Sequence, residues 1–401
     1  MAFSFLKRPA GNKKLGIYVH IPFCKSKCEY CDFYSLGGSR DRHVTDDYLQ
    51  ALADHIKESG RLAPEYVVDT VYFGGGTPSF FGAENLEKIL DEIQRRFRLD
   101  ADAEITLEAN PDSVTNQSLK KLLRAGFNRI SIGVQSDDDE MLKKLGRPHT
   151  YEQARQAVQR AREVGFANVS VDLMYGLPNQ TLTGWKETVE NVLTLKPDHL
   201  SAYALRVEEG TPLWNYRDCA NLPDDDRQAD MYLAACRILH DYGYEHYEIS
   251  NFAKPGFASR HNLKYWNLDE YLGFGPSAAS DFGGKRFSAV ADLRGYIDGI
   301  RQHGTILREC DTIPMRERAG EYVMLRLRTS LGIEEKEYET RFLMPFKPLE
   351  TILTRFQTRG YTEKLEDGRW VLTEQGWLVS NQIIITLNEA QERSTPLAKK
   401  R

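Results

Sequence analysis

The chain has 401 residues, with 53 Lys and Arg against 58 Asp and Glu, and 41% of its residues are hydrophobic. This composition is ordinary for a globular protein of two or three domains, and it excludes a collagen-like or largely disordered chain. The formal net charge of −5 argues against broad electrostatic binding of nucleic acid. Because there is no long apolar run and no secretory signal pattern at the start, we expect a cytoplasmic protein without a membrane span.

Strand and helix patterns alternate along the first 250 residues. Apolar, β-branched runs predict strands at 16–21, 69–73, 104–108, 129–134, 168–174 and 199–205, and amphipathic periodicity predicts helices at 46–59, 83–97, 116–124, 151–164 and 182–195. Such alternation is typical of right-handed βαβ units around a parallel sheet. Six units are too few to close an eight-stranded barrel, so the predicted fold is α/β, a partial (β/α)6 barrel.

The pattern changes after residue 250. Residues 251–276 are rich in aromatic residues, Gly and Pro, and predict a loop with short elements. Helical patterns return from residue 315, and Asp367-Gly368 between two strand-like runs predicts a hairpin. We therefore divide the chain into a core domain at residues 1–250 and a segment at residues 251–401, which ends in a smaller helical, winged-helix-like domain.

Three of the six cysteines, Cys24, Cys28 and Cys31, fall within eight residues. Thiolates this close in sequence are soft ligands suited to zinc or to an iron–sulfur cluster. A structural zinc site would use a fourth ligand from a second Cys or His pair, and no such pair follows. Three thiolates on a four-iron cluster would leave one iron open to a small molecule, which favours the cluster. The scattered Cys219, Cys236 and Cys310 are most simply buried apolar thiols.

Polar and glycine residues follow the predicted strands at their carboxyl ends, where parallel α/β folds bind ligands. The sequence there contains Tyr18, the glycine loop at 74–77, Glu108, Gln135 and Asp172. Glycines allow close approach of a backbone to a ligand, carboxylates can bind ribose hydroxyls, and Arg147 can pair with a carboxylate. The pattern predicts a binding site at this end of the sheet.

The CxxxCxxC spacing, with Tyr30 directly before the last cysteine, resembles the signature of the radical S-adenosylmethionine (SAM) superfamily. That resemblance implies a [4Fe–4S] cluster on Cys24, Cys28 and Cys31, with SAM chelating the fourth iron. The runs IYVHIPFC at 17–24, GGGTP at 74–78, DLMYGLP at 172–178 and LTEQGW at 372–377 resemble, more narrowly, the anaerobic coproporphyrinogen III oxidase family.

Further cofactor contacts are implied by the same resemblance. One SAM would contact Tyr18, Gly75 and Glu108, and Tyr30 also belongs to the implied cofactor site. A second SAM, or its equivalent pocket, would be contacted by residues from several loops: Gly76, Thr77, Gln135, Arg147 and Asp172.

Two departures from the oxidases favour another branch of this family, the HemW-type haem chaperones. The oxidase motif continues to CxxxCxxCxC after a longer N-terminal segment, whereas this chain has Phe33 there and 23 residues before Cys24. The chaperone branch also shows an HNxxYW motif, present here at residues 261–266. The resemblance implies a haem site with His261, Asn262, Tyr265 and Trp266; the alternative is that His261 only forms hydrogen bonds in an aromatic loop.

The function expected from the resemblance is that of a haem carrier. It would hold the cluster, SAM and haem, pass haem to an unidentified acceptor protein, and depend on a reductant for the cluster. The rival is an oxygen-independent coproporphyrinogen III dehydrogenase, in which a 5′-deoxyadenosyl radical would abstract hydrogen from each propionate. A zinc-stabilised binding module is the third alternative.

Overall fold

The computed structural model describes residues 13–38, 41–218 and 221–397. Within these residues, its centre is one sheet of twelve strands, of which the seven from β11 to β8 run parallel. The order across the sheet is β14 (Leu307–Thr312), β13 (Lys285–Ala289), β12 (Ala279–Phe282), β11 (Tyr271–Phe274), β1 (Lys13–Ile21), β4 (Tyr66–Gly75), β5 (Arg98–Ala109), β6 (Arg129–Gln135), β7 (Asn168–Tyr175), β8 (His199–Ala204), β10 (Asn251–Ala253) and β9 (Glu245–Glu248).

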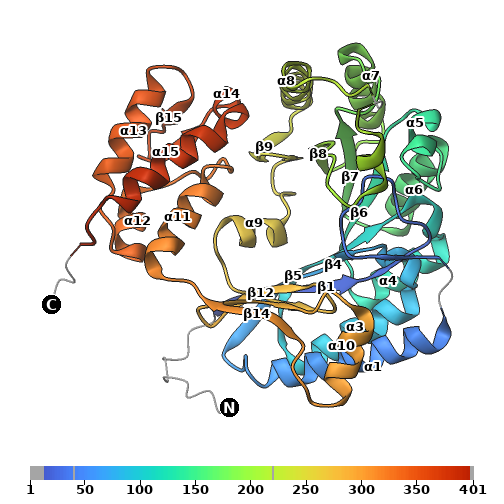
Figure 1. Ribbon diagram of the computed structural model, residues 1–401. Helices are drawn as coiled ribbons and strands as arrows, with labels where there is room; N and C mark the ends of the chain where they lie inside the picture. The colour runs from blue at the N-terminus through green and yellow to red at the C-terminus, as the bar shows by residue number, and fades with distance from the viewer. Residues whose placement is uncertain (1–12, 39–40, 219–220, 398–401) are drawn as a thin grey trace.

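The six predicted strands are confirmed as β1 and β4 to β8. The five predicted helices are confirmed as α1 (Arg42–Gly60), α3 (Ala83–Arg96), α4 (Asn116–Ala125), α6 (Tyr151–Val164) and α7 (Leu182–Leu193), which lie along the outside of the curved sheet (Figure 1). Local signals set their ends: the Thr115 and Thr150 side chains cap the first turns of α4 and α6, and Gly126 and Gly165 end these helices in the left-handed region. The predicted partial barrel is therefore correct.

Burial on both faces explains why these strands are so apolar. All residues of β6 except its last are buried, as expected for a strand covered by helices on one face and by the barrel interior on the other. Between the sheet and its outer helices, Trp185 of α7 is fully buried, and its indole N–H donates to the Met231 carbonyl at 2.8 Å. The helices thus cover the outer face of the sheet, and the loops that follow the strands surround their carboxyl ends.

The segment beyond residue 250 contains more regular structure than expected. It includes α9 (Arg260–Trp266) and β11, which pairs in parallel with the free side of β1 and extends the sheet through β12 to β14. The domain division at residue 250 stays a prediction. The expectation of a buried thiol is wrong for Cys310, which is exposed on β14, and right for Cys236; Cys219 lies outside the described residues.

A smaller C-terminal unit of helices carries a hairpin, as predicted. The turn at Asp367-Gly368 joins the two antiparallel strands, and Gly368 has φ 89°, which a glycine adopts without strain. The unit consists of α11 (Met315–Arg326), α12 (Glu335–Phe342), α13 (Lys347–Gln357), β15 (Thr362–Lys364), β16 (Trp370–Leu372), α14 (Glu374–Leu378) and α15 (Ser380–Glu392).

The remaining elements are short or connect the larger ones. They are β2 (Phe23–Cys24), β3 (Leu36–Gly37), α2 (Pro78–Phe81), α5 (Asp139–Lys144), α8 (Asp225–Asp241), α10 (Leu293–Arg301) and single turns at Pro111–Ser113 and Pro212–Tyr216. Among the described residues, no helix is both long and apolar enough to cross a membrane.

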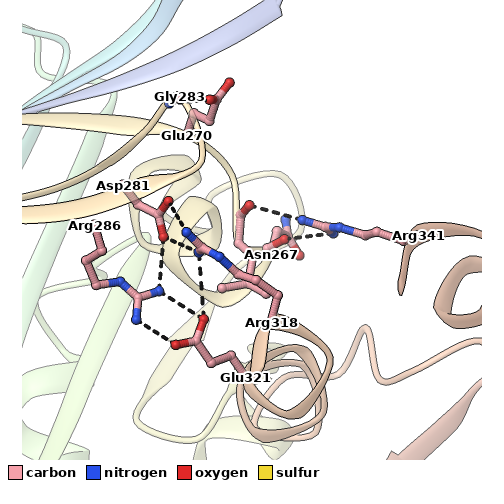
Figure 2. Close-up of polar contacts among 9 residues, drawn as sticks. Asn267, Glu270, Asp281, Gly283, Arg286, Arg318, Glu321 and Arg341 are labelled. Atoms are coloured by element: carbon pink, nitrogen blue, oxygen red, sulfur yellow. Dashed lines mark hydrogen bonds and ion pairs between the residues drawn. The ribbon is translucent and has the colours of Figure 1, made fainter. Parts of the chain in front are cut away.

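The C-terminal unit is joined to the sheet by a network of arginines and carboxylates (Figure 2). Arg286 of β13 donates to both carboxylate oxygens of Glu321 on α11, at 2.6 and 3.0 Å. Arg318 of α11 donates in the opposite direction to both oxygens of Asp281 on β12. Because a planar guanidinium that donates two hydrogen bonds fixes orientation as well as distance, these pairs hold α11 in a defined orientation against β12 and β13.

A second set of arginines connects the C-terminal unit to the end of α9. Arg326 of α11 donates to the Asn267 side chain at 2.6 Å. Arg341 of α12 donates to the carbonyls of Asn267 and Leu268 at 3.2 and 3.1 Å (Figure 2). Helix ends leave carbonyls without intrahelical partners. Side chains of the C-terminal unit supply those partners here.

Candidate functional site

The three clustered cysteines lie in the segment that follows β1. Cys24 and Cys28 are 8% and 9% exposed, Cys31 is half-buried, and the Cys31 N–H donates to the Cys28 carbonyl at 3.2 Å. Burial raises the pKa of the Cys24 and Cys31 thiols. Without a cation to stabilise the thiolates, these side chains therefore stay protonated.

The sulfur atoms of the three clustered thiols do not all lie as close together as the ligands of a single zinc ion. Four ligands of one zinc ion lie about 3.3–3.8 Å from one another. The set of described residues whose ligand atoms all come within 4.8 Å of one another is Cys236, His246 and Glu374, and the three clustered thiols do not form such a set. A four-iron cluster accepts wider spacing because each thiolate binds a different iron.

The glycine loop and an arginine contact the cysteine segment. The hydroxyl of Thr77 donates to Cys24 Sγ at 3.4 Å, and Arg147 Nη1 donates to Cys28 Sγ at 3.6 Å. The N–H of Gly76 donates to the Ile21 carbonyl at 2.8 Å, and a Cβ on Gly76 would lie only 2.7 Å from that oxygen. Residue 76 therefore has to be glycine for the two segments to meet.

Tyr30 anchors the cysteine loop on an apolar cluster at the ends of β7 and β8. Burial raises the pKa of its phenol. The backbone of Glu29 donates to the Leu145 carbonyl at 3.1 Å and accepts from the Leu213 N–H at 2.8 Å, which holds the loop from both sides. The buried members of the apolar cluster are Met141, Leu145, Met174, Leu177, Leu205 and Leu213.

Glu108 and Tyr18 lie on neighbouring sides of Tyr72 inside the barrel. The Tyr72 hydroxyl donates to Glu108 Oε1 at 2.8 Å, and the Tyr72 ring stacks on Tyr18 with centroids 6.3 Å apart. Tyr18 in turn contacts His20 Nδ1 at 3.1 Å through its hydroxyl. Burial, and next the charge of Asp172, raises the pKa of Glu108 to about 7. Sequence reasoning missed Tyr72, although it stands only two residues before the glycine loop.

Two further glycines of the loop allow close packing at this point. A Cβ on Gly74 would lie 3.0 Å from Glu108 Oε1, and one on Gly75 would lie 2.5 Å from the His20 ring. Gly75 also has φ 104°, which disfavours other residues. The loop thus brings backbone atoms directly to Glu108 and His20.

Arg147 extends across the strand ends with an unsatisfied donor. Its Nη2 donates to Asn110 Oδ1 and to the Gly133 carbonyl, both at 2.8 Å, while its buried Nε has no hydrogen-bond partner. A buried donor of this kind is suited to an anionic ligand group such as a carboxylate. Gln135 at the end of β6 is in the left-handed region with φ 68°, a strained conformation often found at functional sites.

Asp172 lies on β7 beside β6 and accepts from the Ser131 hydroxyl at 3.0 Å. Burial raises the pKa of its carboxyl group. Two of the residues expected at a second SAM, Thr77 and Arg147, also contact the thiols of the cysteine loop. All predicted SAM residues thus lie around one end of the sheet, and their roles stay predictions.

The HNxxYW residues form α9, with His261 facing the barrel interior. His261 is 1% exposed, and its ring contacts the Thr70 hydroxyl through Nδ1 and the Tyr265 hydroxyl through Nε2, both at 2.8 Å. Burial lowers its pKa to about 3. Asn262 and Trp266 are half-buried. Because both ring nitrogens have partners, iron ligation by His261 requires one of these hydrogen bonds to open, and the haem assignment stays a prediction.

Two buried charged groups that sequence reasoning missed hold α9 in place. The carboxylate of Glu104 on β5 accepts from the backbone N–H groups of Arg260 and His261, both at 3.0 Å, at the start of the helix. Lys264, 5% exposed, forms an ion pair with Asp69 of β4 at 2.7 Å. The carboxylate of Glu104 inside an apolar strand pattern is the sequence signal from which its contact with α9 could have been predicted.

Comparison with known proteins places this arrangement in a family. Residues 18–192 match the Radical SAM superfamily model, and residues 313–379 match the HemN C-terminal domain. The chain is 36% identical to Heme chaperone HemW of Bacillus subtilis, over 91% of this chain and 97% of the relative, and 35% identical to that of Escherichia coli, over 92% and 97%.

Solved structures agree with the sequence matches. The fold superimposes on the coproporphyrinogen III oxidase HemN of Escherichia coli, described as a radical SAM enzyme, with a TM-score of 0.82 and 25% identity over 94% of this chain and 90% of that chain. The identity to the HemW proteins is higher and extends over nearly their whole length. The chain is a member of the HemW heme chaperone family, built on the radical SAM fold.

Proposed function

We propose that this protein binds haem and transfers it to an acceptor protein, and that it holds a [4Fe–4S] cluster and SAM at the carboxyl ends of the strands. The observation that carries the proposal is the 35–36% identity to heme chaperones along almost the entire chain. The HNxxYW helix next to the predicted SAM residues adds support, because His261 and Glu108 both contact Tyr72.

The residues present fit the proposed cofactors. Cys24, Cys28 and Cys31 would hold the cluster, and the unpartnered Nε of Arg147 supports binding of an anionic group such as the SAM carboxylate. When bound, the cluster and SAM together supply one-electron chemistry. The chain itself positions these groups: Thr77 and Arg147 donate toward the thiols, and the glycine loop lets the backbone come close.

A second candidate function is oxygen-independent oxidation of coproporphyrinogen III. The TM-score of 0.82 to HemN favours it, as does the presence of every residue expected to contact SAM. Against it stands Phe33, which occupies the position of the oxidases' fourth cysteine and is 63% exposed. An exposed phenyl ring cannot provide a thiolate there.

One experiment separates the two functions. Anaerobically reconstituted and reduced protein, with iron and sulfide assayed on the same sample, is incubated with SAM and coproporphyrinogen III and followed by mass spectrometry. A parallel sample is titrated with haem and then mixed with a haem-free globin as acceptor probe. If the protein binds haem and transfers it but forms no decarboxylated product, the result supports the haem carrier. The proposal would be overturned if product forms over many turnovers, or if a sample that holds its cluster does not bind haem.

The acceptor, the reductant and the location belong to the same proposal. A reductant is needed because SAM chemistry at such clusters starts from the reduced state. We retain the cytoplasmic location that the sequence predicts. Fractionation of cells, followed by detection of the protein, tests that location directly.

A further inference from the structure

Three side chains with metal-binding atoms meet where the sheet contacts the C-terminal unit. Cys236 lies on α8, His246 on β9, and Glu374 is the first residue of α14. One ligand atom from each lies within 4.8 Å of the other two, and Cys236 Sγ is 3.7 Å from His246 Nδ1. In Figure 1, α14 of the C-terminal unit faces α8 and β9.

Polar atoms in this cluster lack the partners that buried groups normally have. Neither Nε2 of His246 nor the Tyr232 hydroxyl, both buried, has a hydrogen-bond partner. The imidazole is held between two aromatic rings: it stacks on Phe252 with centroids 4.0 Å apart and meets Trp377 edge-on at 4.3 Å. Its orientation toward the Cys236 thiol is therefore set by packing.

Two of the three groups, the imidazole and the thiol, are uncharged while no cation is present. Burial lowers the pKa of His246 to about 3, which keeps the imidazole neutral with a free lone pair. Burial, and next the charge of Glu374, raises the pKa of the Cys236 thiol, so the thiol keeps its proton while no cation is present. A bound cation would reverse this balance and release the thiol proton to solvent.

We propose that Cys236, His246 and Glu374 form a zinc-binding site separate from the cysteine loop. Zinc takes sulfur, imidazole nitrogen and carboxylate oxygen at about 2.0–2.3 Å, which places ligand atoms about 3.3–3.8 Å apart. The Cys236–His246 pair already has this spacing. Glu374 is exposed, so its carboxylate is free to close the remaining distance, and the fourth position is open to water.

The site would join two parts of the molecule. Cys236 and His246 belong to the sheet side and Glu374 to the C-terminal unit, so one ion would hold the two together. We expect bound zinc to raise the temperature at which the full chain unfolds, because it binds only the folded arrangement.

Zinc stoichiometry of the full chain, loaded with its iron–sulfur cluster, tests the proposal. After dialysis against zinc and then a weak chelator, we expect about one zinc per chain. The Cys236→Ser and His246→Ala variants should lose this zinc, and Glu374→Gln should bind it at least about tenfold more weakly. Cys310→Ser, which changes an exposed cysteine on β14, is the matched control and should retain it.

Cobalt provides a second readout that does not depend on the cluster loop or on the folding of the buried-site variants. In the full chain carrying Cys24→Ala, Cys28→Ala and Cys31→Ala, added Co²⁺ should give thiolate-to-cobalt absorption, weakened by Glu374→Gln, a change at an exposed position. Absence of that absorption from the folded protein, or zinc retained by both Cys236→Ser and His246→Ala, would overturn the proposal.

Discussion

Tyr72 stacks on His261, with ring centroids 5.2 Å apart and planes inclined by 24°. The hydroxyl of the same tyrosine donates to Glu108 at 2.8 Å. One side chain of β4 thus joins the residue proposed for haem to a residue proposed for SAM. A substitution of His261 or of Glu108 can therefore shift the other residue through their shared contact with Tyr72.

The cysteine loop gives the first prediction. Replacing Cys24, Cys28 and Cys31 together by Ala should abolish the broad iron–sulfur absorption near about 400 nm after anaerobic reconstitution, because each thiolate binds a different iron. Cys310→Ala should leave it unchanged, since that cysteine is exposed on a distant edge strand. Absorption that survives the triple change would show that the ligands lie elsewhere.

The buried carboxyl of Glu108 should make stability depend on pH. Its pKa is raised from 4.5 to about 7, mainly by burial, so the folded chain retains a proton that the unfolded chain releases between these values. The contribution of Glu108 to the free energy of unfolding should therefore be largest below pH 4.5. It should fall as the pH rises from 4.5 to about 7, by up to about 3 kcal/mol in total.

Glu108→Gln should flatten that part of the profile. Denaturant unfolding of the SAM-free protein at pH 5 and pH 8 measures the difference. Glu187→Gln, at an exposed position of α7, is the control and should keep the parental difference. An unchanged difference in Glu108→Gln would mean that another group causes the dependence.

Haem binding should respond in opposite directions to two changes in α9. His261→Ala should weaken haem binding by about tenfold or more while cluster content stays constant, because an iron ligand is removed. Tyr265→Phe should strengthen binding, because it removes the hydroxyl that contacts His261 Nε2 at 2.8 Å. Optical haem titration measures both affinities. His240→Ala, at an exposed position, is the control and should bind haem as the parent does. If His261→Ala binds haem as tightly as the parent, His261 is not part of the site.

The ion pair beneath α9 should be important for stability. Lys264→Met leaves Asp69 buried without its cation and should lower the free energy of unfolding by about 3–5 kcal/mol. Adding Asp69→Asn should restore part of this loss. Arg155→Met, which breaks an exposed pair with Glu152, should have little effect. A small loss in Lys264→Met would show that Asp69 finds water or another donor.

The sequence predicted the parallel sheet well because its strands are buried on both faces and therefore carry long apolar runs, as β6 does. It did not predict β11, since that strand lies within a segment rich in Gly, Pro and aromatic residues, and only its pairing with β1 makes it part of the sheet. Strand edges are satisfied by tertiary contacts, which local composition does not encode.

For the site residues too, local sequence signals could be recognised and contacts between distant segments could not. Cys24 and the glycine loop could be found because their spacing is itself a chemical signal. Tyr72 carries no such signal, and Glu104 carries only that of a carboxylate in an apolar strand pattern. Both act on α9, which begins 156 residues after Glu104. The approach of Arg147 to Cys28 likewise exists only in the folded barrel.

The arginines that reach α9 from the C-terminal unit have a consequence for exchanging parts between related proteins. Arg326 and Arg341 satisfy the groups at residues 267 and 268, directly after the HNxxYW helix. A chimera that joined this barrel to the C-terminal unit of an oxidase would need matching donors at both positions. Exchanging the C-terminal unit would therefore also change the contacts at the end of the helix proposed to bind haem.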